Sequence, residues 1–105
     1  MKIKNQTEIT ISSISYDMEN RVLSLKNGEQ KLSNKEDRLL RLMIENQNKV
    51  LERDNILVET LGDKNFFNRR LLEVYIEKFI KFFKEDENIE IERIKGIGFK
   101  FSIKK

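Results

Sequence analysis

Residues 94–101 read IKGIGFKF, with two glycines one residue apart. Gly96 and Gly98 allow two interpretations, a loop that cradles a phosphate or the tight turn of a β-hairpin. A phosphate loop of this kind runs from a strand into a helix whose N-terminus faces the anion. Here an alternation of apolar and polar residues, typical of a strand, begins at Phe99. The pattern therefore predicts a hairpin with one strand before the glycines and one after them.

The segment before this hairpin has a helical period. Leu72, Ile76, Phe79 and Phe83 recur at spacings of four, three and four, so residues 69–84 are predicted to form a helix with one apolar stripe against a core. The opposite face of this helix carries Arg70, Val74, Glu77, Lys78 and Lys81. This largely basic face is expected to meet solvent or an acidic partner.

Two shorter helices are predicted upstream. Ser33 and Glu36 form a capping box that opens the first, residues 39–44 continue it with apolar side chains at helical spacing, and residues 46–48 end it.

The second helix is predicted from about Arg53 to Leu61, with Gly62 as its C-terminal stop. Residues 62–68, GDKNFFN, are expected to form the loop that follows.

The N-terminal part has a period of two. Within residues 7–32, Ile9 and Ile11 alternate with polar residues, and Asn27-Gly28 is typical of a two-residue hairpin turn. The connections are too short for parallel crossovers, so we expect a small antiparallel sheet.

The composition limits the possible functions. The 105 residues carry a net charge of +3, fit one domain, and include neither cysteine nor histidine. Without histidine the chain lacks the commonest general base and metal ligand, and its carboxylates, lysines and hydroxyls show no catalytic spacing. We therefore expect a binding module with no catalytic residue, metal site or cofactor. The absence of cysteine, of an apolar signal segment and of a membrane-spanning run fits a cytoplasmic protein.

The basic excess lies near the C-terminus. Residues 64–105 carry eleven basic and seven acidic side chains, whereas residues 33–63 carry five basic and seven acidic ones. Such asymmetry suggests an acidic partner such as DNA, RNA or a membrane surface.

Three helices, the third with a basic face, followed by a β-hairpin make a winged helix. The sequence resembles the DNA-binding effector domain of the OmpR/PhoB family of two-component response regulators over nearly its whole length. The matching segments are 33–36, Leu39-Leu40, 50–53, Leu61-Gly62, 70–76 and the wing motif 93–99. The resemblance implies an α+β winged helix-turn-helix with a four-stranded antiparallel N-terminal sheet, three helices and a C-terminal hairpin wing.

The resemblance also implies a mode of action. The helix at about 69–84 would enter a major groove of double-stranded DNA, and the wing, residues 93–100, would touch the flanking minor groove or backbone. Members usually bind direct repeats as head-to-tail homodimers. They usually carry an N-terminal receiver domain that a sensor histidine kinase controls. We expect residues 1–105 to be a single effector domain, the C-terminal part of a longer regulator whose receiver is absent from this chain.

The family's loop that contacts RNA polymerase corresponds here to Leu61, Gly62, Asp63, Lys64, Asn65, Phe66, Phe67 and Asn68. Its candidate DNA contacts correspond to Arg53, Arg70, Val74, Tyr75, Glu77, Lys78, Lys81, Arg93, Lys95 and Lys100. The basic residues among them would reach phosphates or a narrow minor groove, or would simply be solvated at the surface. The Tyr75 hydroxyl could bond a phosphate, or its ring could flank the core half-buried.

Glu77 departs from the family pattern, because members often have a basic residue there. We hypothesise that its carboxylate accepts a hydrogen bond from a cytosine amino group while Val74 meets a thymine methyl. The alternative is that Glu77 pairs with Lys81 at i+4.

Asp37 also departs, because it replaces a usually aromatic position, and Phe66 or Phe67 is expected to fill the lost volume. Ile80 and Phe82 widen the apolar stripe of the third helix, either as a dimer or receiver contact or by burial under the wing.

Two other functions remain possible. The winged helix could serve mainly protein–protein contact, with RNA polymerase or a receiver domain, and bind DNA weakly. Residues 71–83, LLEVYIEKFIKFF, could instead lie on a membrane as a basic amphipathic helix, but a folded core explains the same stripe, so no membrane partner is expected. Affinity that falls steeply with salt would identify the DNA binder.

Overall fold

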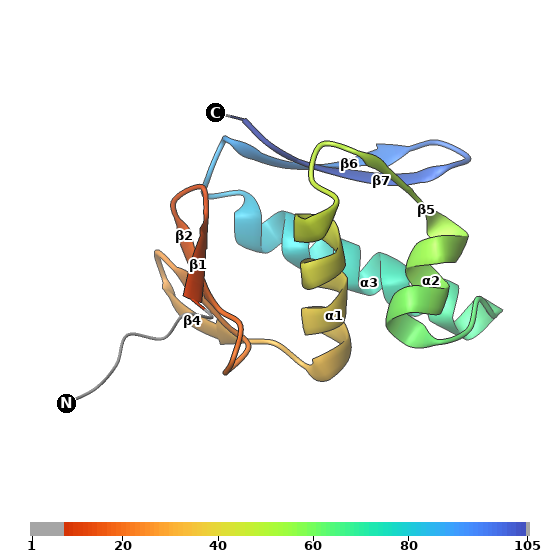
Figure 1. Cartoon of the computed structure of the whole chain (residues 1–105), viewed down its shortest axis with the longest axis horizontal. Helices are drawn as coiled ribbons and strands as arrows, with labels where there is room; N and C mark the ends of the chain where they lie inside the picture. Colours follow the sequence, from red (N-terminus) through yellow and green to blue (C-terminus); the bar gives the residue numbers. More distant parts are fainter. Residues whose placement is uncertain (1–7, 105) are drawn as a thin grey trace.

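The computed structural model describes residues 8–104, which form an α+β fold of seven strands and three helices. The strands are β1 (Glu8–Ile11), β2 (Ile14–Asp17), β3 (Val22–Leu25), β4 (Gly28–Lys31), β5 (Val50–Glu52), β6 (Ile89–Ile94) and β7 (Gly98–Ile103). The helices are α1 (Asn34–Glu45), α2 (Arg53–Leu61) and α3 (Phe66–Phe83). Figure 1 shows β1–β4 at one end of the molecule and the tip of the β6–β7 hairpin at the other, with α1 between them.

The N-terminal sheet is an antiparallel meander in the order β1-β2-β3-β4, which confirms the predicted short strands. The predicted strand region begins at residue 7, which lies outside the described residues. The turn between β3 and β4 differs by one residue from the prediction, because Leu25 pairs with Gly28 and leaves Lys26 and Asn27 as the turn. Gly28 is needed all the same, since its φ of +129° is a conformation that other residues rarely adopt.

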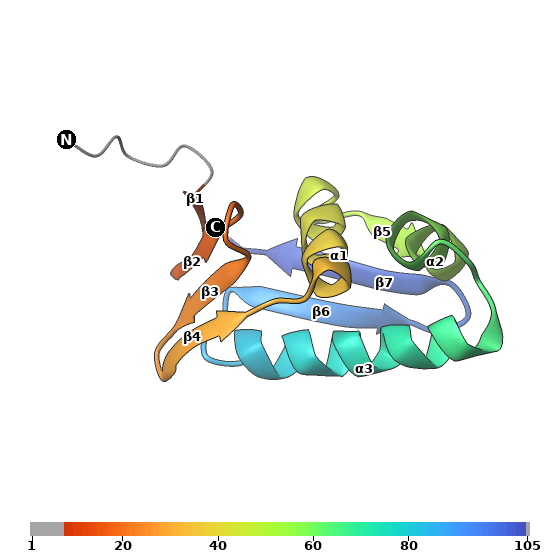
Figure 2. The ribbon, with the colours of Figure 1, turned by 90° about the horizontal axis from the view of Figure 1, so that it is seen from below.

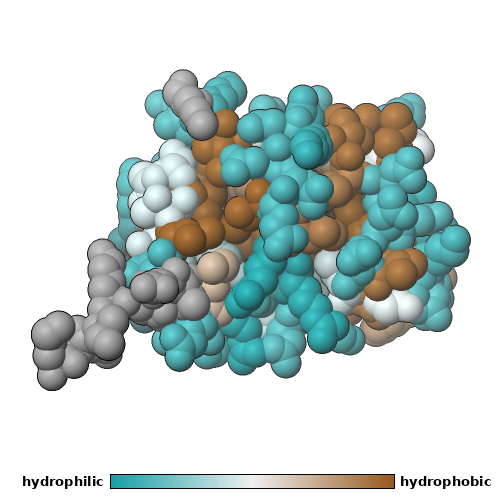
Figure 3. Space-filling model, viewed as in Figure 1, coloured by the Kyte–Doolittle hydropathy of each residue, from teal (hydrophilic) through white to brown (hydrophobic). Residues whose placement is uncertain are grey.

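α1 opens and ends as predicted. The Ser33 hydroxyl accepts from the Glu36 amide at 3.2 Å, and the Glu36 carboxylate accepts from the Ser33 amide at 2.8 Å, which completes the capping box. Leu39 and Leu40 on the inner face are fully buried. Figure 3 shows the outer face as a hydrophilic band with apolar surface on both sides of it.

The β6–β7 hairpin answers the question posed by the two glycines. Gly96 sits in the turn with a φ of +76°, and a strand rather than a helix follows. Gly98 has a different role, because a Cβ there would overlap the carbonyl oxygen of Leu51 and lie 2.9 Å from the Arg53 amide nitrogen. The glycines therefore build a hairpin and let another segment approach its backbone closely.

That segment is β5, which the sequence did not reveal. β5 pairs with β7, so the C-terminal sheet has the order β5-β7-β6. Its three residues lead directly into α2, and the Arg53 amide donates to the Ile97 carbonyl at 2.9 Å. The entry to α2 is thus bonded to the wing.

α3 begins three residues before the predicted start. Asn65 is its N-cap, and the Asn65 side chain accepts from the Asn68 amide at 2.8 Å. Asn68 is buried and donates through Nδ2 to the Asp63 carbonyl at 2.9 Å. The predicted loop 62–68 is therefore only 62–65. Figure 2 shows α3 running alongside the β6–β7 hairpin.

The exposed start of α3 corrects a prediction about the core. Phe66 and Phe67 are 68% and 70% exposed, so neither fills the volume near Asp37. Asp37 itself is buried, and its hydrogen-bond partners are the hydroxyl of Tyr16 and the guanidinium of Arg41. The lost aromatic volume is replaced by a hydrogen-bonded network.

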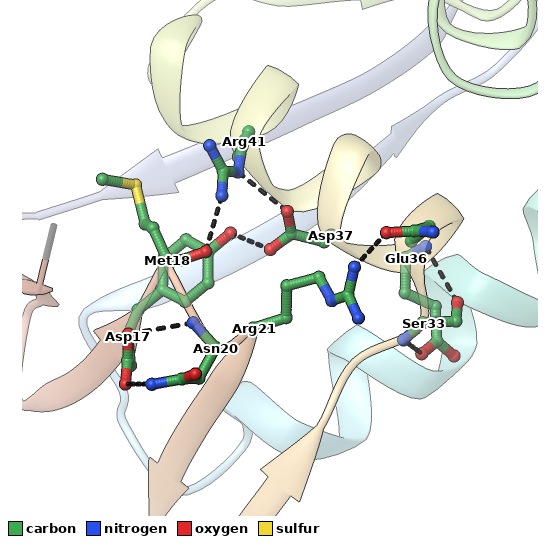
Figure 4. Close-up of polar contacts among 10 residues, drawn as sticks. Asp17, Met18, Asn20, Arg21, Ser33, Glu36, Asp37 and Arg41 are labelled. Atoms are coloured by element: carbon green, nitrogen blue, oxygen red, sulfur yellow. Dashed lines mark hydrogen bonds and ion pairs between the residues drawn. The ribbon is translucent and has the colours of Figure 1, made fainter.

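Figure 4 shows this network between α1 and the N-terminal sheet. The Tyr16 hydroxyl donates to one Asp37 oxygen, and Arg41 Nε donates to the other at 2.8 Å. Arg41 also donates to the Met18 carbonyl at 2.7 Å. Burial, and then the hydrogen bond to Asp37, raises the pKa of Tyr16 well above its ordinary value, so the hydroxyl keeps the proton that it donates.

The main core lies between the helices and both sheets. Leu72, Ile76, Phe79 and Phe83 are all buried, which confirms the predicted stripe of α3. None of the helices in the described part of the chain has the length and apolar character that a membrane crossing requires.

Candidate nucleic-acid interface

The outer face of α3 is the first part of the candidate interface. Arg70, Val74, Glu77, Lys78 and Lys81 are all exposed, on the side opposite the buried stripe. The predicted division of α3 into an inner and an outer face is confirmed. The N-terminal half of this face begins directly after the short 62–65 loop, where α2 and α3 meet.

The wing is the second part. Arg93 and Lys95 are exposed and Lys100 is half-buried. A hollow of about 130 Å³ lies between the wing and α3, and its lining includes Arg53, Glu73, Arg93 and Lys95. Three predicted DNA contacts from two distant segments of the chain therefore converge on one place.

An ion pair joins the wing to α3. Arg93 Nη2 donates to Glu77 Oε2 at 2.7 Å and to Glu73 Oε1 at 3.3 Å. The hydrogen bond with Glu77 is the main reason that the pKa of Arg93 is raised. The alternative pairing of Glu77 with Lys81 is wrong, because the Glu77 carboxylate binds across to the wing instead of along its own helix.

Lys78 is held from the other side. Its Nζ donates to Glu36 Oε2 at 2.7 Å and lies 5.9 Å from the centroid of the Phe82 ring. Burial alone would raise the pKa of the Glu36 carboxyl, but the Lys78 ammonium and the Ser33 amide outweigh it and leave that pKa below its ordinary value. Glu36 therefore stays ionised and ties the start of α1 to the middle of α3.

Three half-buried side chains of α3 lie at the edge of the core. Tyr75, Ile80 and Phe82 are half-buried and pack against the buried cluster. This favours the core role of the Tyr75 ring over a phosphate contact, and burial of Ile80 and Phe82 over an exposed dimer surface.

The start of α3 carries an apolar surface that the sequence analysis missed. Phe67, Leu71 and Val74 line an open hollow of about 480 Å³ together with Arg70 and Glu73. The Arg70 guanidinium lies 5.6 Å from the centroid of the Phe66 ring. The spacing of residues 67, 71 and 74 contains a helical signal, but the predicted loop ended at residue 68 and hid it.

Comparison with known proteins agrees with this geometry. Residues 27–101 match the family described as "Transcriptional regulatory protein, C terminal". The chain belongs to this family. It is a DNA-binding domain of the OmpR/PhoB type, as the resemblance in the sequence predicted.

A relative extends the match beyond the family segment. The transcriptional regulatory protein RprY of Bacteroides fragilis is 36% identical over 99 residues, which are 94% of this chain and 42% of that protein. This OmpR/PhoB-type domain thus spans about two-fifths of the length of the curated relative.

Solved structures share the fold. The DNA-binding domain of CpxR from E. coli superposes with a TM-score of 0.75 at 15% identity, covering 93% of this chain and 98% of that one. The Klebsiella pneumoniae RstA DNA-binding domain, solved in complex with the RstA box, has a TM-score of 0.71 at 21% identity and covers 92% and 98%. The winged-helix architecture predicted for this OmpR/PhoB-type domain is confirmed.

Proposed function

We propose that the domain binds a specific double-stranded DNA site, with α3 in the major groove and the β6–β7 wing on the flanking minor groove or backbone. The observation that carries the proposal is the convergence of Arg53, Arg93 and Lys95 beside the exposed face of α3. A DNA backbone is the acidic partner that matches such a cluster of basic side chains. The CpxR and RstA domains, which share this fold, are DNA-binding domains.

The basic residues position the domain on the phosphates. Arg70 and Lys81 lie on α3, Arg53 lies at the start of α2, and Lys95 and Lys100 lie on the wing. Their contacts would fix register and orientation without reading bases.

Lys78 and Arg93 are also predicted to contact phosphates, but they differ from the other basic residues. Each side chain is bound to a carboxylate, Lys78 to Glu36 and Arg93 to Glu77 and Glu73. To bind a phosphate, each would exchange that carboxylate for a phosphate oxygen. We therefore expect weaker contributions to affinity from these two than from Arg70 or Lys95.

Base reading is assigned to Glu77 and Val74. The Glu77 carboxylate is 56% exposed, so it can still accept a hydrogen bond while Arg93 holds one of its oxygens. In the major groove the cytosine amino group is the donor that a carboxylate recognises, and an apolar side chain such as Val74 recognises the thymine methyl. Tyr75 is left a minor role, since its ring is half-buried.

The other partners follow from the family. We infer that two copies bind direct repeats head to tail, and that the full regulator works in the cytoplasm. The chain spans 42% of the length of its relative RprY. We infer that the full regulator also has a receiver domain that a sensor histidine kinase controls.

A protein contact is a second function that one observation favours. Phe66 and Phe67 stand 68% and 70% exposed at the start of α3, and Val58 on α2 is 52% exposed. Large apolar side chains exposed together mark an interaction surface. We propose that the segment 61–68 meets RNA polymerase when the domain is on DNA, through Phe66 and not through Phe67, which lines the hollow on the DNA-facing side of α3.

The test is a selection from random duplexes, followed by anisotropy titrations of the enriched site across salt. We expect an enriched direct repeat and an affinity that falls steeply with salt. Arg70→Ala and Lys95→Ala should each flatten the slope of log affinity against log salt by about one phosphate contact. Lys26→Ala, in the turn at the opposite end of the molecule, is the matched control and should leave the slope unchanged. Failure to enrich any sequence would contradict the proposal.

A further inference from the structure

α3 has a second apolar row besides the one in the core. Phe67, Leu71 and Val74 follow the spacing i, i+4, i+7, so they share one face of the helix. The structure leaves Phe67 70% and Val74 59% exposed, and Leu71 half-buried. A helix that needed only to cover the core would carry polar residues here, so this row requires an explanation.

The three side chains of the row line one hollow and are not scattered singly over the surface. Its open volume is about 480 Å³, and Arg70 and Glu73 complete its lining. Scattered exposed apolar residues are ordinary on protein surfaces, whereas an apolar concavity with a charged rim marks a binding surface. The row also lies on the face of α3 that the proposed function places in the major groove.

The charges around the row indicate what fills it. Arg70 borders the hollow, and Lys78 and Lys81 continue the same exposed face toward the C-terminus of α3. These three cations outnumber the two carboxylates beside the strip, Glu73 and Glu77. An apolar strip with such an excess of positive charge is complementary to a surface whose apolar groups lie between rows of phosphates. The DNA major groove is such a surface, and the thymine C5-methyl is the apolar group that its base edges present.

We propose that Phe67, Leu71 and Val74 form one strip that reads several thymine methyls, so that each half-site carries a run of thymines on one strand. This inference rests on the proposed function and specifies the sequence that α3 selects. Phe67 and Leu71 can neither donate nor accept a hydrogen bond through their side chains, so a polar base edge opposite them would be desolvated without a partner.

The length of the strip sets the length of the run. Seven residues of helix rise about 10.5 Å, at roughly 1.5 Å per residue. Successive base pairs are about 3.4 Å apart along the duplex axis, so the strip spans at most about three base-pair steps, and fewer as α3 tilts to follow the groove. We expect a run of at most about four thymines next to the base pair that Glu77 reads.

The experiment replaces thymine by deoxyuridine in the enriched site. This change deletes only the methyl group and keeps every hydrogen-bonding edge of the base pair. Burying one methyl-sized group is worth about 0.8 kcal/mol, so each critical methyl should change Kd by about fourfold. The full substitution of a run should weaken binding by more than tenfold on the same basis, while the salt slope stays unchanged.

Protein variants then assign the effect to the strip. Phe67→Ala and Leu71→Ala should lower affinity for the thymine duplex and remove most of the difference between thymine and deoxyuridine. Phe66→Ala is the matched control, because Phe66 is equally exposed at the same end of α3 but lies outside the hollow. That variant should keep the full methyl penalty.

Two outcomes overturn the inference in distinguishable ways. Equal affinity for the thymine and deoxyuridine duplexes, with sequence selection and salt dependence intact, would refute methyl reading and leave DNA binding standing; the strip would then face a protein. No enriched sequence at all would remove the proposed function and the inference together.

Discussion

Gly98 shows how one residue can decide the position of a whole wing. It has an ordinary strand conformation, so its importance does not come from a positive φ, as it does at Gly96. It comes from the backbone of β5, which occupies the place of a side chain on Gly98. The hairpin pattern in the sequence could predict a turn glycine, but it could not predict a neighbour from residues 50–52.

We expect Gly98→Ala to destabilise the domain more than Gly96→Ala. The methyl at Gly98 would meet the Leu51 carbonyl, and backbone must shift to admit it, at a cost of about 1–3 kcal/mol. The methyl at Gly96 meets open space, so only the left-handed conformation is penalised, by about 1 kcal/mol. Urea unfolding of both variants measures the difference. A larger loss at Gly96 would contradict the close approach of β5.

Asp37 is a residue whose surroundings could not be predicted from the sequence pattern. Helical spacing places it inward, and its family position suggested lost aromatic volume. Its partners Tyr16 and Arg41 instead make it a buried hydrogen-bonding centre. Hydrophobic periodicity records which face a residue occupies, but it carries no information on which distant hydroxyl satisfies a carboxylate.

At the scale of elements, features set by neighbouring residues were predicted correctly, whereas pairings between distant segments were not. The bounds of α2, Arg53–Leu61, match the prediction because the helical period and the glycine stop are both local. β5 has only three residues, and it exists because β7 pairs with it. The ion pair of Glu77 and Arg93 joins residues 16 positions apart. Helical spacing points only to partners one turn away on the same helix, such as Lys81.

The ion pair between Lys78 on α3 and Glu36 on α1 leads to a prediction about stability. Glu36 is 5% exposed, so removing Lys78 leaves its carboxylate with fewer donors in a dry place. We expect Lys78→Ala to lower the free energy of unfolding by about 1–3 kcal/mol, less than for a fully buried pair because Lys78 is itself 43% exposed. Lys81→Ala, on the exposed face, should change it by less than about 0.5 kcal/mol.

A rescue variant separates the ion pair from packing. Glu36→Gln keeps the capping box, since glutamine can also bond the N-cap amide. Combined with Lys78→Ala, it removes both charges while the side-chain stem stays absent, and it should recover most of the stability lost in Lys78→Ala alone. If the double variant is no more stable than Lys78→Ala, the loss comes from the side-chain stem and not from the buried carboxylate. DNA titrations of Lys78 variants should therefore be run well below their unfolding temperatures.

At the scale of the whole molecule, the N-terminal sheet is fastened to the end of α3. The Ser13 amide and hydroxyl donate to Asp86 Oδ2 at 2.9 and 2.6 Å, and the Asn88 amide donates to Oδ1 at 2.9 Å. Nearby, the Lys26 amide donates to the Glu85 carboxylate at 3.1 Å. The bonds of Ser13 and Lys26 join segments more than 50 residues apart, so they are formed only when both the sheet and α3 are in place.

Asp86 makes this junction sensitive to pH. The serine hydroxyls of Ser13 and Ser12, followed by the backbone amides, hold the pKa of its carboxyl well below the ordinary value of 3.8. A carboxyl with a depressed folded-state pKa stabilises the fold above its unfolded pKa and loses that stabilisation as pH falls through the folded pKa. The stabilisation should therefore be complete above about pH 5 and decline below pH 4.

We expect Asp86→Asn to lower the free energy of unfolding by about 1–3 kcal/mol at pH 7 and by less at pH 3. Other carboxylates titrate in both proteins, so the difference between wild type and variant isolates Asp86. Glu87→Gln changes an exposed neighbouring carboxylate and should stay within about 0.5 kcal/mol of wild type at both pH values. Urea unfolding at the two pH values provides the measurement. A difference that does not shrink on acidification would mean that Asp86→Asn loses stability because its amide NH2 cannot accept the hydrogen bonds that both Asp86 oxygens accept, and not because the charge is missing.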